Sequence, residues 1–132
     1  MRILLTGCKG QLGLELMTRF AGLGYETLAT DLHNLDITDQ SQVWSAVEGF
    51  RPEFIINCAA YTNVDQAESD EENAFRVNAV GARNLSVAAY RVKAGIAQVS
   101  TDYVFDGLNA TAPLREYHSV NPVSCYGRSK EL

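Results

Sequence analysis

Short apolar runs alternate with amphipathic stretches along the whole chain, and this alternation restricts the folds that the sequence can adopt. The apolar runs at residues 3–5, 25–30, 54–58 and 96–99 are too short for helices and have glycine or proline close by. Strands of this kind, separated by helices, form parallel sheets that helices cover on both faces. The predicted fold class is therefore α/β, with a doubly wound parallel sheet whose crossovers are right-handed.

The amphipathic stretches supply the helices that join these strands. The first helix, expected over residues 11–24, places Leu12 on its buried face. The second is expected to begin at Thr38 as the capping residue. The third and longest, expected over residues 69–94, opens with the spacing of a capping box. A further helix is expected to begin at Tyr126.

Composition and charge exclude several classes of protein. The chain has 132 residues, of which 46% are hydrophobic and 20% charged, so it forms at most one domain and can bury a real core. Its net charge of −5 comes without a basic cluster, which argues against nucleic-acid binding. No apolar run approaches the roughly 20 residues that cross a membrane.

The cysteines and the acidic residues give no metal-site pattern. Cys8, Cys58 and Cys125 are odd in number and far apart, so we expect no disulfide framework, no zinc site and a cytoplasmic location. The acidic run over residues 65–72 lacks metal-site spacing, and no metal is expected there.

The segment after the first strand has the pattern G-x-x-G-x-x-G, formed by Gly7, Gly10 and Gly13. In such a loop the first glycine allows a tight turn, the second lets the backbone approach a pyrophosphate, and the third lets the helix pack on the sheet. The helix N-terminus then offers free N–H groups and a positive dipole end to the phosphates. A tight connection without a ligand is the alternative, but a strand before and a helix after are the context that a dinucleotide site requires.

Asp31 closes the second strand about 20 residues beyond the glycine loop, where a carboxylate accepts hydrogen bonds from ribose hydroxyls. A carboxylate in this place repels a 2′-phosphate, whereas Lys9, directly before Gly10, attracts one. The choice between NADH and NADPH therefore stays open. The alternative for Asp31 is a turn or helix-capping residue.

Tyr126 and Lys130 form a Y-x-x-x-K pattern, which places both side chains on one face of a helix. A phenol with an ordinary pKa of about 10 exchanges protons more readily when a nearby ammonium group favours the phenolate. Tyr126 is thus the candidate proton donor to a carbonyl, with Lys130 supporting it and binding the nicotinamide ribose. The segment over residues 100–105, which begins with Ser100 and Thr101, follows the last strand, where a hydroxyl is placed to polarise a substrate carbonyl. Asn78 is either part of a proton relay behind Lys130 or a buried amide that bonds nearby backbone.

Six segments resemble the extended short-chain dehydrogenase/reductase family, and within it the dTDP-4-dehydrorhamnose reductases. They are ILLTGCKGQLG, LDITD, INCAAYTNVDQAE, VNAVGARNL, STDYVFDG and NPVSCYGRSKEL. They are spread over all 132 residues, and STDYVFDG is far more specific than the glycine loop. The resemblance implies a Rossmann-like NAD(P)-binding domain over residues 1–132, truncated before the last strands and a C-terminal substrate domain.

The resemblance also implies an activity and the residues that carry it. The reaction is the reduction, by hydride from NADPH or NADH, of the C4 carbonyl of dTDP-4-dehydro-L-rhamnose, a dTDP-linked 4-keto-6-deoxyhexose. The catalytic residues are Thr101, Tyr126 and Lys130. The residues that face the sugar are Thr101, Asp102 and Tyr103. Together with the residues argued above, the expected cofactor-binding set is Gly7, Lys9, Gly10, Gln11, Leu12, Asp31, Leu32, Asp36, Ile37, Ala59, Ala60, Tyr61, Thr62, Asn78, Tyr126 and Lys130.

Two other functions fit the same residues. The regulatory β subunit of methionine adenosyltransferase is similar to this branch of the family, acts by binding a partner protein, and can retain the catalytic residues as relics. A nucleotide-sugar epimerase or dehydratase is the second, since a dehydratase is expected to carry an acidic residue directly after Thr101, where Asp102 stands. Because family members continue well beyond Lys130, we expect the 132-residue chain alone to have little or no reductase activity. A homodimer is a further expectation for the complete protein.

Overall fold

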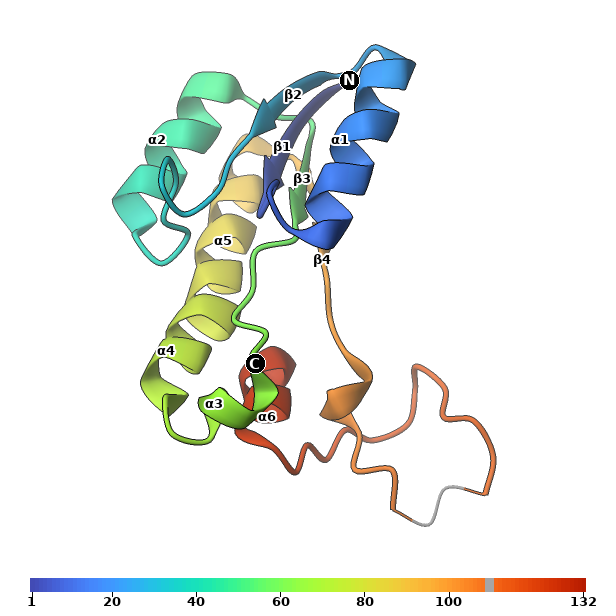
Figure 1. Ribbon diagram of the computed structural model, residues 1–132. Helices are drawn as coiled ribbons and strands as arrows, with labels where there is room; N and C mark the ends of the chain where they lie inside the picture. The colour runs from blue at the N-terminus through green and yellow to red at the C-terminus, as the bar shows by residue number, and fades with distance from the viewer. Residues whose placement is uncertain (109–110) are drawn as a thin grey trace.

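The computed structural model describes residues 1–108 and 111–132, and its centre is a parallel sheet of four strands (Figure 1). In chain order the strands are β1 (Arg2–Thr6), β2 (Glu26–Ala29), β3 (Phe54–Asn57) and β4 (Gly95–Gln98). They lie side by side in the order β2-β1-β3-β4, so the chain leaves β1 toward one edge and returns to its other side for β3. This reversal confirms the doubly wound α/β fold and creates, between β1 and β3, a switch point of the kind at which open α/β sheets bind ligands.

Helices cover both faces of the sheet (Figure 1). α1 (Gln11–Leu23) covers one face, whereas α2 (Gln40–Phe50) and α5 (Ala82–Val92) cover the other. Four shorter helical segments lie beyond the carboxyl ends of the strands. They are α3 (Val64–Ala67), α4 (Glu71–Phe75), the 3-10 turn η2 (Asp102–Val104) and α6 (Cys125–Glu131). α6 contacts the other three. In the part of the chain that the structure describes, no helix has the length and apolar character needed to cross a membrane.

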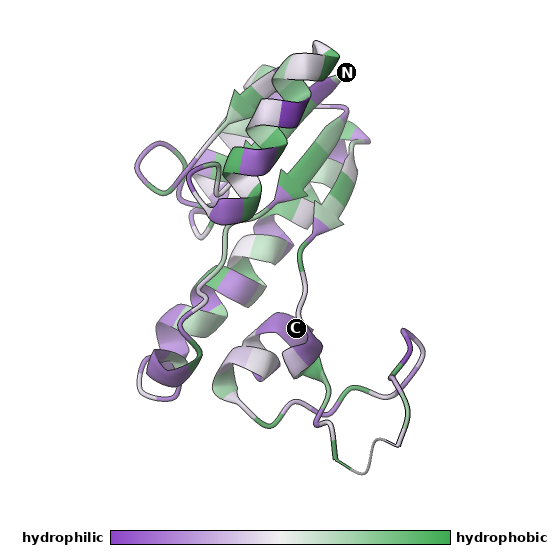
Figure 2. Cartoon of the chain, turned by 45° about the vertical axis from the view of Figure 1, so that its right-hand side comes forward, coloured by the Kyte–Doolittle hydropathy of each residue, from purple (hydrophilic) through white to green (hydrophobic). Residues whose placement is uncertain are grey.

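Alternate residues of each strand point to opposite faces, which gives the sheet two apolar cores. Leu4 and Ile55 are fully buried beneath α2 and α5, whereas Ile3 and Leu5 pack beneath Phe20 of α1. Figure 2 shows the strands mainly in green, the colour of apolar residues. Each fully buried aliphatic side chain of this kind stabilises the fold by roughly 1.5–3 kcal/mol.

The start of α2 differs by one residue from the prediction. Asp39, not Thr38, is the capping residue, and its carboxylate accepts the backbone N–H groups of Ser41 at 2.8 Å and Gln42 at 3.2 Å. Thr38 is engaged by the preceding residues instead, because its N–H and hydroxyl both donate to the carboxylate of Asp36, at 2.9 and 2.8 Å. A local turn that Asp36 forms thus moves the cap one position along the chain.

The predicted helix over residues 69–94 forms with two differences. Ser69 does not cap it, because its hydroxyl donates to the carbonyl of Gln66 at the end of α3, and Asp70 is the residue that precedes α4. Between α4 and α5, residues Arg76–Gly81 (η1) form a π-helix, a wider turn that occurs often at functional sites. The apolar periodicity of the sequence did not reveal it, because one wide turn leaves the average spacing nearly unchanged.

Candidate functional site

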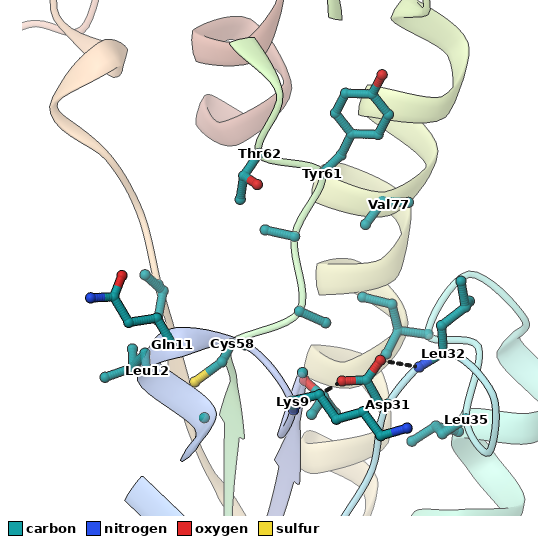
Figure 3. Close-up of a pocket in the computed structure, with 18 of the residues that line it drawn as sticks. Lys9, Gln11, Leu12, Asp31, Leu32, Leu35, Cys58, Tyr61, Thr62 and Val77 are labelled. Carbon is teal, nitrogen blue, oxygen red and sulfur yellow. Dashed lines mark hydrogen bonds between the residues drawn. The ribbon is translucent and has the colours of Figure 1, made fainter. Parts of the chain in front are cut away.

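A cavity of about 900 Å³ lies at the carboxyl ends of the strands, beside the switch point between β1 and β3 (Figure 3). Its walls come from the end of β1 with the glycine loop and the start of α1, and from the residues after β2, after β3 and after β4, with contributions from α6 and from one residue of η1. The volume is within the roughly 300–1,000 Å³ that is usual for small-molecule and cofactor sites. Every residue expected to bind a cofactor lines this cavity, with the exception of Asn78.

The glycine loop is a tight turn that depends on two of its glycines. Gly7 has a left-handed φ of 66°, and a Cβ there would lie 2.6 Å from the backbone nitrogen of Ala59. A Cβ at Gly13 would lie 2.7 Å from the Cα of Cys8, so the third glycine packs against the loop itself rather than against a strand. Gly10 precedes α1 in an extended conformation, and none of the described side chains caps this helix. The N–H groups of its first turn are therefore left for a ligand.

Leu12 does not belong to the apolar core, contrary to the prediction. It is 45% exposed and lines the cavity together with Gln11, as Figure 3 shows. The buried residues of α1 are Gly13 and Phe20. The first turn of α1 lies beyond the end of β1, so a residue there that continues the apolar stripe contacts the cavity instead of a strand.

Asp31 joins the glycine loop to the segment after β2. One carboxylate oxygen accepts the backbone N–H of Lys9 at 3.1 Å, and the other accepts that of Leu32 at 2.9 Å (Figure 3). The hydrogen bond from Lys9 lowers the pKa of Asp31 below its ordinary value. The ammonium nitrogen of Lys9 lies 3.4 Å from Nδ1 of His33. The backbone carbonyl of Asp31 also accepts the N–H of Asn34 in a turn. Asp31 therefore both lines the cavity and belongs to a turn, the two alternatives that the sequence left open.

The wall after β3 is formed by residues 59–62, and it is fixed mainly through Tyr61. The N–H of Tyr61 donates to Oδ1 of Asn78 at 2.8 Å, and its carbonyl accepts from Nδ2 of Asn78 at 3.0 Å. Figure 3 shows the ring of Tyr61 directed away from the glycine loop, and its hydroxyl donates to Asp70 at 3.1 Å. Burial raises the pKa of this phenol. Tyr61 therefore contributes mainly its backbone to the cavity.

Asn78 stands behind this wall and not in the cavity. Besides its two hydrogen bonds to Tyr61, its amide donates to the hydroxyl of Ser129 at 2.9 Å. The ammonium group of Lys130 donates to the carbonyl of Val99. The contacts of Asn78 are thus those of a buried amide that satisfies nearby polar groups, and the proton relay behind Lys130 stays a prediction.

Tyr126 and Lys130, four residues apart on α6, both line the cavity. The ammonium nitrogen of Lys130 is 2.6 Å from the carbonyl oxygen of Val99, and burial lowers the pKa of this lysine. The ring of Tyr126 packs edge-on against Tyr103, with 5.7 Å between the ring centres. The structure therefore brings together the two residues that the Y-x-x-x-K spacing places on one helical face.

Thr101 is not in the wall of this cavity. Its hydroxyl accepts the backbone N–H of Tyr103 at 3.2 Å, and this hydrogen bond caps the 3-10 turn η2. The same hydroxyl donates to the carboxylate of Asp102 at 3.2 Å. Asp102 and Tyr103 line a second cavity of about 590 Å³. Ser100, the residue before, lines the large cavity in place of Thr101.

Sequence reasoning also missed residues of the large cavity. They stand next to predicted positions: Leu35 and Thr38 flank Asp36 and Ile37, and Val99 precedes the segment over residues 100–105 that was expected near the substrate. Ser100 belongs to that segment, which was expected there because ligands lie at the carboxyl ends of parallel strands. The remaining lining residues that the sequence reasoning did not name are Thr6, Cys58 and Val77.

The chain is similar to several curated proteins, among them dTDP-4-dehydrorhamnose reductases. A dTDP-4-dehydrorhamnose reductase of Aggregatibacter actinomycetemcomitans is 45% identical to this chain over 130 residues. The match includes 98% of this chain and 44% of that protein. Such identity along nearly the whole chain implies a shared fold and shared ancestry.

Solved structures agree with this result. A dTDP-4-dehydrorhamnose reductase of Clostridium acetobutylicum matches with a TM-score of 0.96 at 46% identity, over 99% of this chain and 46% of that one. A dTDP-4-dehydrorhamnose reductase of Bacillus anthracis in complex with NADP matches with a TM-score of 0.94 at 44% identity, over 98% and 46%. The chain thus spans about half the length of these relatives. The family model described as "RmlD substrate binding domain" matches residues 1–132, and the chain therefore belongs to that family.

Proposed function

We propose that this chain forms the cofactor-binding part of an NADPH-dependent reductase that converts dTDP-4-dehydro-L-rhamnose to dTDP-L-rhamnose. Relatives at 45% and 46% identity carry the name of that reductase, and the Bacillus anthracis relative is in complex with NADP. One observation carries the proposal: the glycine loop, Asp31 and the Tyr126–Lys130 pair line a single cavity.

The residues present fit a dinucleotide. Gly7 and Gly13 keep the loop close to α1, and the uncapped N-terminus of α1 offers N–H groups and a positive dipole end to a pyrophosphate. Beside the loop, each carboxylate oxygen of Asp31 accepts one backbone N–H and keeps a lone pair for a ribose hydroxyl. Two adjacent parts of the cavity therefore have the chemistry that the pyrophosphate and the ribose of an adenosine diphosphate group require.

In the proposed reaction bound NADPH supplies the hydride to C4 of the sugar. Tyr126 donates the proton to the carbonyl oxygen, which becomes the C4 hydroxyl. The Lys130 ammonium has three N–H donors, of which one is used by the Val99 carbonyl. Among the residues that the structure describes the other two have no partner, so they can bind the phenol oxygen of Tyr126 and a ribose hydroxyl, which favours the phenolate that remains after proton transfer.

The cofactor is proposed to be NADPH because of the charges beside Asp31. The ammonium group of Lys9 is exposed at the mouth of the cavity and lies beside the ring of His33. A 2′-phosphate in this place gains a charge-assisted hydrogen bond from Lys9. Both oxygens of Asp31 are engaged by backbone N–H groups, which offsets part of its repulsion toward that phosphate.

Thr101, Asp102 and Tyr103 are proposed to face the sugar. The ring contact between Tyr103 and Tyr126 makes the second cavity a neighbour of the proposed proton donor. A substrate oxygen would replace the carboxylate of Asp102 as the acceptor of the Thr101 hydroxyl, while the N–H of Tyr103 keeps that hydroxyl in place.

The test uses the complete protein, NADPH and dTDP-4-dehydro-L-rhamnose, with loss of NADPH absorbance and the mass of the product as readouts. We expect steady turnover to dTDP-L-rhamnose. Tyr126→Phe should lower kcat by about 10²–10⁴-fold, the usual contribution of a general acid, while NADPH binding measured by calorimetry is retained. Tyr90→Phe, on an exposed tyrosine of α5, is the matched control and should leave kcat unchanged.

Other results would lead to different conclusions. NADPH binding without reduction of the sugar would contradict the proposal and would favour a nucleotide-binding regulatory subunit, which a pull-down for a synthetase partner then tests. Release of a different nucleotide sugar would favour an epimerase or a dehydratase. The 132-residue chain alone is predicted to show little or no turnover.

A further inference from the structure

A buried hydroxyl links the π-helical segment Arg76–Gly81 to α6. Ser129 is 0% exposed and lies between Tyr126 and Lys130 on α6. Its hydroxyl accepts a hydrogen bond from Nδ2 of Asn78 at 2.9 Å and donates one to the carbonyl oxygen of Tyr126 at 2.7 Å. Ser129 therefore connects a side chain of the π-helix to the backbone that carries Tyr126.

α6 depends on such contacts for its position. It has seven residues, and a helix of this length is not stable in water without packing partners. At its start the hydroxyl of Ser124 accepts a backbone N–H at 3.0 Å, and Oε1 of Glu68 accepts the N–H of Cys125 at 2.7 Å. These contacts fix the first turn. The contact of Ser129 with Asn78 fixes the second turn, between the two residues that line the cavity.

Asn78 is the common partner of two walls of the cavity. It is 4% exposed, and its two N–H donors go to the Tyr61 carbonyl and to the hydroxyl of Ser129. The two N–H donors of a buried amide are both satisfied only when both acceptors are in place. A buried donor without an acceptor destabilises the fold, because it has lost its hydrogen bond to water. The amide of Asn78 thus couples the position of residues 59–62 to the position of α6.

We propose that Ser129 is a positioning residue for the reaction: through Asn78 it fixes α6 so that Tyr126 and Lys130 face the cavity together. This inference rests on the proposed function, since it assigns Ser129 a part in that reaction. Ser129→Ala removes the hydroxyl and leaves one N–H of Asn78 without its partner. The hydrogen bonds between Asn78 and Tyr61 remain, and no residue of the glycine loop is changed.

The experiment compares Ser129→Ala with Ser86→Ala in the complete protein. Ser86 is a matched control, because it is an exposed helical serine whose hydroxyl also donates to a carbonyl one turn back. Ser129→Ala should lower kcat about tenfold to a hundredfold, since small misplacements of reacting groups are costly, and should change the Kd for NADPH less than about threefold. Ser86→Ala should change neither quantity.

A double-mutant cycle tests whether Ser129 acts through Asn78. In an Asn78→Ala background, Ser129→Ala should lower kcat by less than about threefold further, because residues of one hydrogen-bonded network are not additive. Equal losses with and without Asn78 would overturn the proposal. An unchanged kcat in Ser129→Ala alone would overturn it as well.

Alkylation of Cys125 by iodoacetamide gives a readout that does not require turnover. Cys125 is 1% exposed at the start of α6, and a helix of only seven residues opens cooperatively, so loosening of its second turn also exposes the first. Alkylation of Cys125 should therefore be about tenfold faster in Ser129→Ala but not in Ser86→Ala. Peptide mass mapping separates it from Cys8 and Cys58. If the wild-type protein reduces no sugar, the proposed function fails, and the alkylation rates still decide whether Ser129 fixes α6. An unchanged rate would show that it does not.

Discussion

The ammonium group of Lys130 donates a 2.6 Å hydrogen bond to the carbonyl of Val99, the first residue beyond β4. The same carbonyl accepts a second hydrogen bond, at 3.2 Å, from the side-chain amide of Gln98. Gln98 in turn accepts from Asn57 at 2.7 Å, and Asn57 accepts from the hydroxyl of Thr6. Thr6, Asn57 and Gln98 occupy paired positions on β1, β3 and β4. A row of polar side chains therefore follows the carboxyl edge of the sheet and ends at Lys130.

Replacement of Lys130 separates its chemical role from its structural one. Burial lowers the pKa of Lys130, so the charged ammonium carries a desolvation cost in the folded protein at neutral pH. Lys130→Met removes this cost, and we expect a Tm equal to or above that of the wild type. The same variant should lose about 10²–10⁴-fold in kcat. Lys93→Met, at the end of α5, is the control and should keep its kcat. A Lys130→Met enzyme with more than about a tenth of wild-type turnover would contradict the proposed role of the ammonium.

Lys9 is expected to decide the preference between NADPH and NADH. Its ammonium nitrogen lies 3.4 Å from Nδ1 of His33, its backbone N–H donates to Asp31, and NADH lacks the 2′-phosphate that the ammonium group would bind. Lys9→Ala should weaken NADPH binding about tenfold, the value of one charge-assisted hydrogen bond, and should change NADH binding much less. Calorimetric titration of both cofactors into both proteins measures the ratio. Equal losses for the two cofactors would place the 2′-phosphate elsewhere.

The parts of the molecule that depend on local sequence were predictable. The strands follow from short apolar runs, and the glycine loop follows from the spacing of Gly7, Gly10 and Gly13 between a strand and a helix. The position of Asp31 follows from the end of β2, because parallel strands bring their carboxyl ends to one edge. These features need no knowledge of which distant segments meet.

The features that were missed depend on contacts between distant segments or on competition within one turn. The π-helical turn carries Asn78, whose partners Tyr61 and Ser129 are 17 and 51 residues away in the sequence. Thr38 was assigned the role of helix cap by its type and position. The neighbouring Asp36 engages its hydroxyl instead, and no periodicity in the sequence records that competition.

The packing of the glycine loop predicts opposite effects for one substitution at two places on α1. A Cβ at Gly13 would lie 2.7 Å from the Cα of Cys8, whereas a Cβ at Gly22 meets no atom within 4 Å. Gly13→Ala should destabilise the fold by about 1–3 kcal/mol and weaken NADPH binding, because the loop backbone must move. Gly22→Ala should stabilise it by about 0.5–1 kcal/mol, the ordinary gain from alanine within a helix. Urea unfolding of both variants measures the difference, and a destabilised Gly22→Ala would show that the helix tolerates no added methyl group.

Asp39 should make the stability of the fold depend on pH in the acid range. Its carboxylate accepts hydrogen bonds from Ser41 and Gln42 at the start of α2, and the bond from the Ser41 hydroxyl is foremost in lowering its pKa from 3.8 to about 2. A group whose pKa is lower in the folded protein stabilises the fold above its unfolded pKa, and this contribution is lost as the pH falls through the folded pKa. Asp39→Asn keeps a capping oxygen but has no charge to titrate. The wild type should therefore unfold at higher urea than Asp39→Asn above about pH 4, and the difference should shrink toward zero near pH 2. A difference that is the same at every pH would mean that the carboxylate charge does not contribute to the cap.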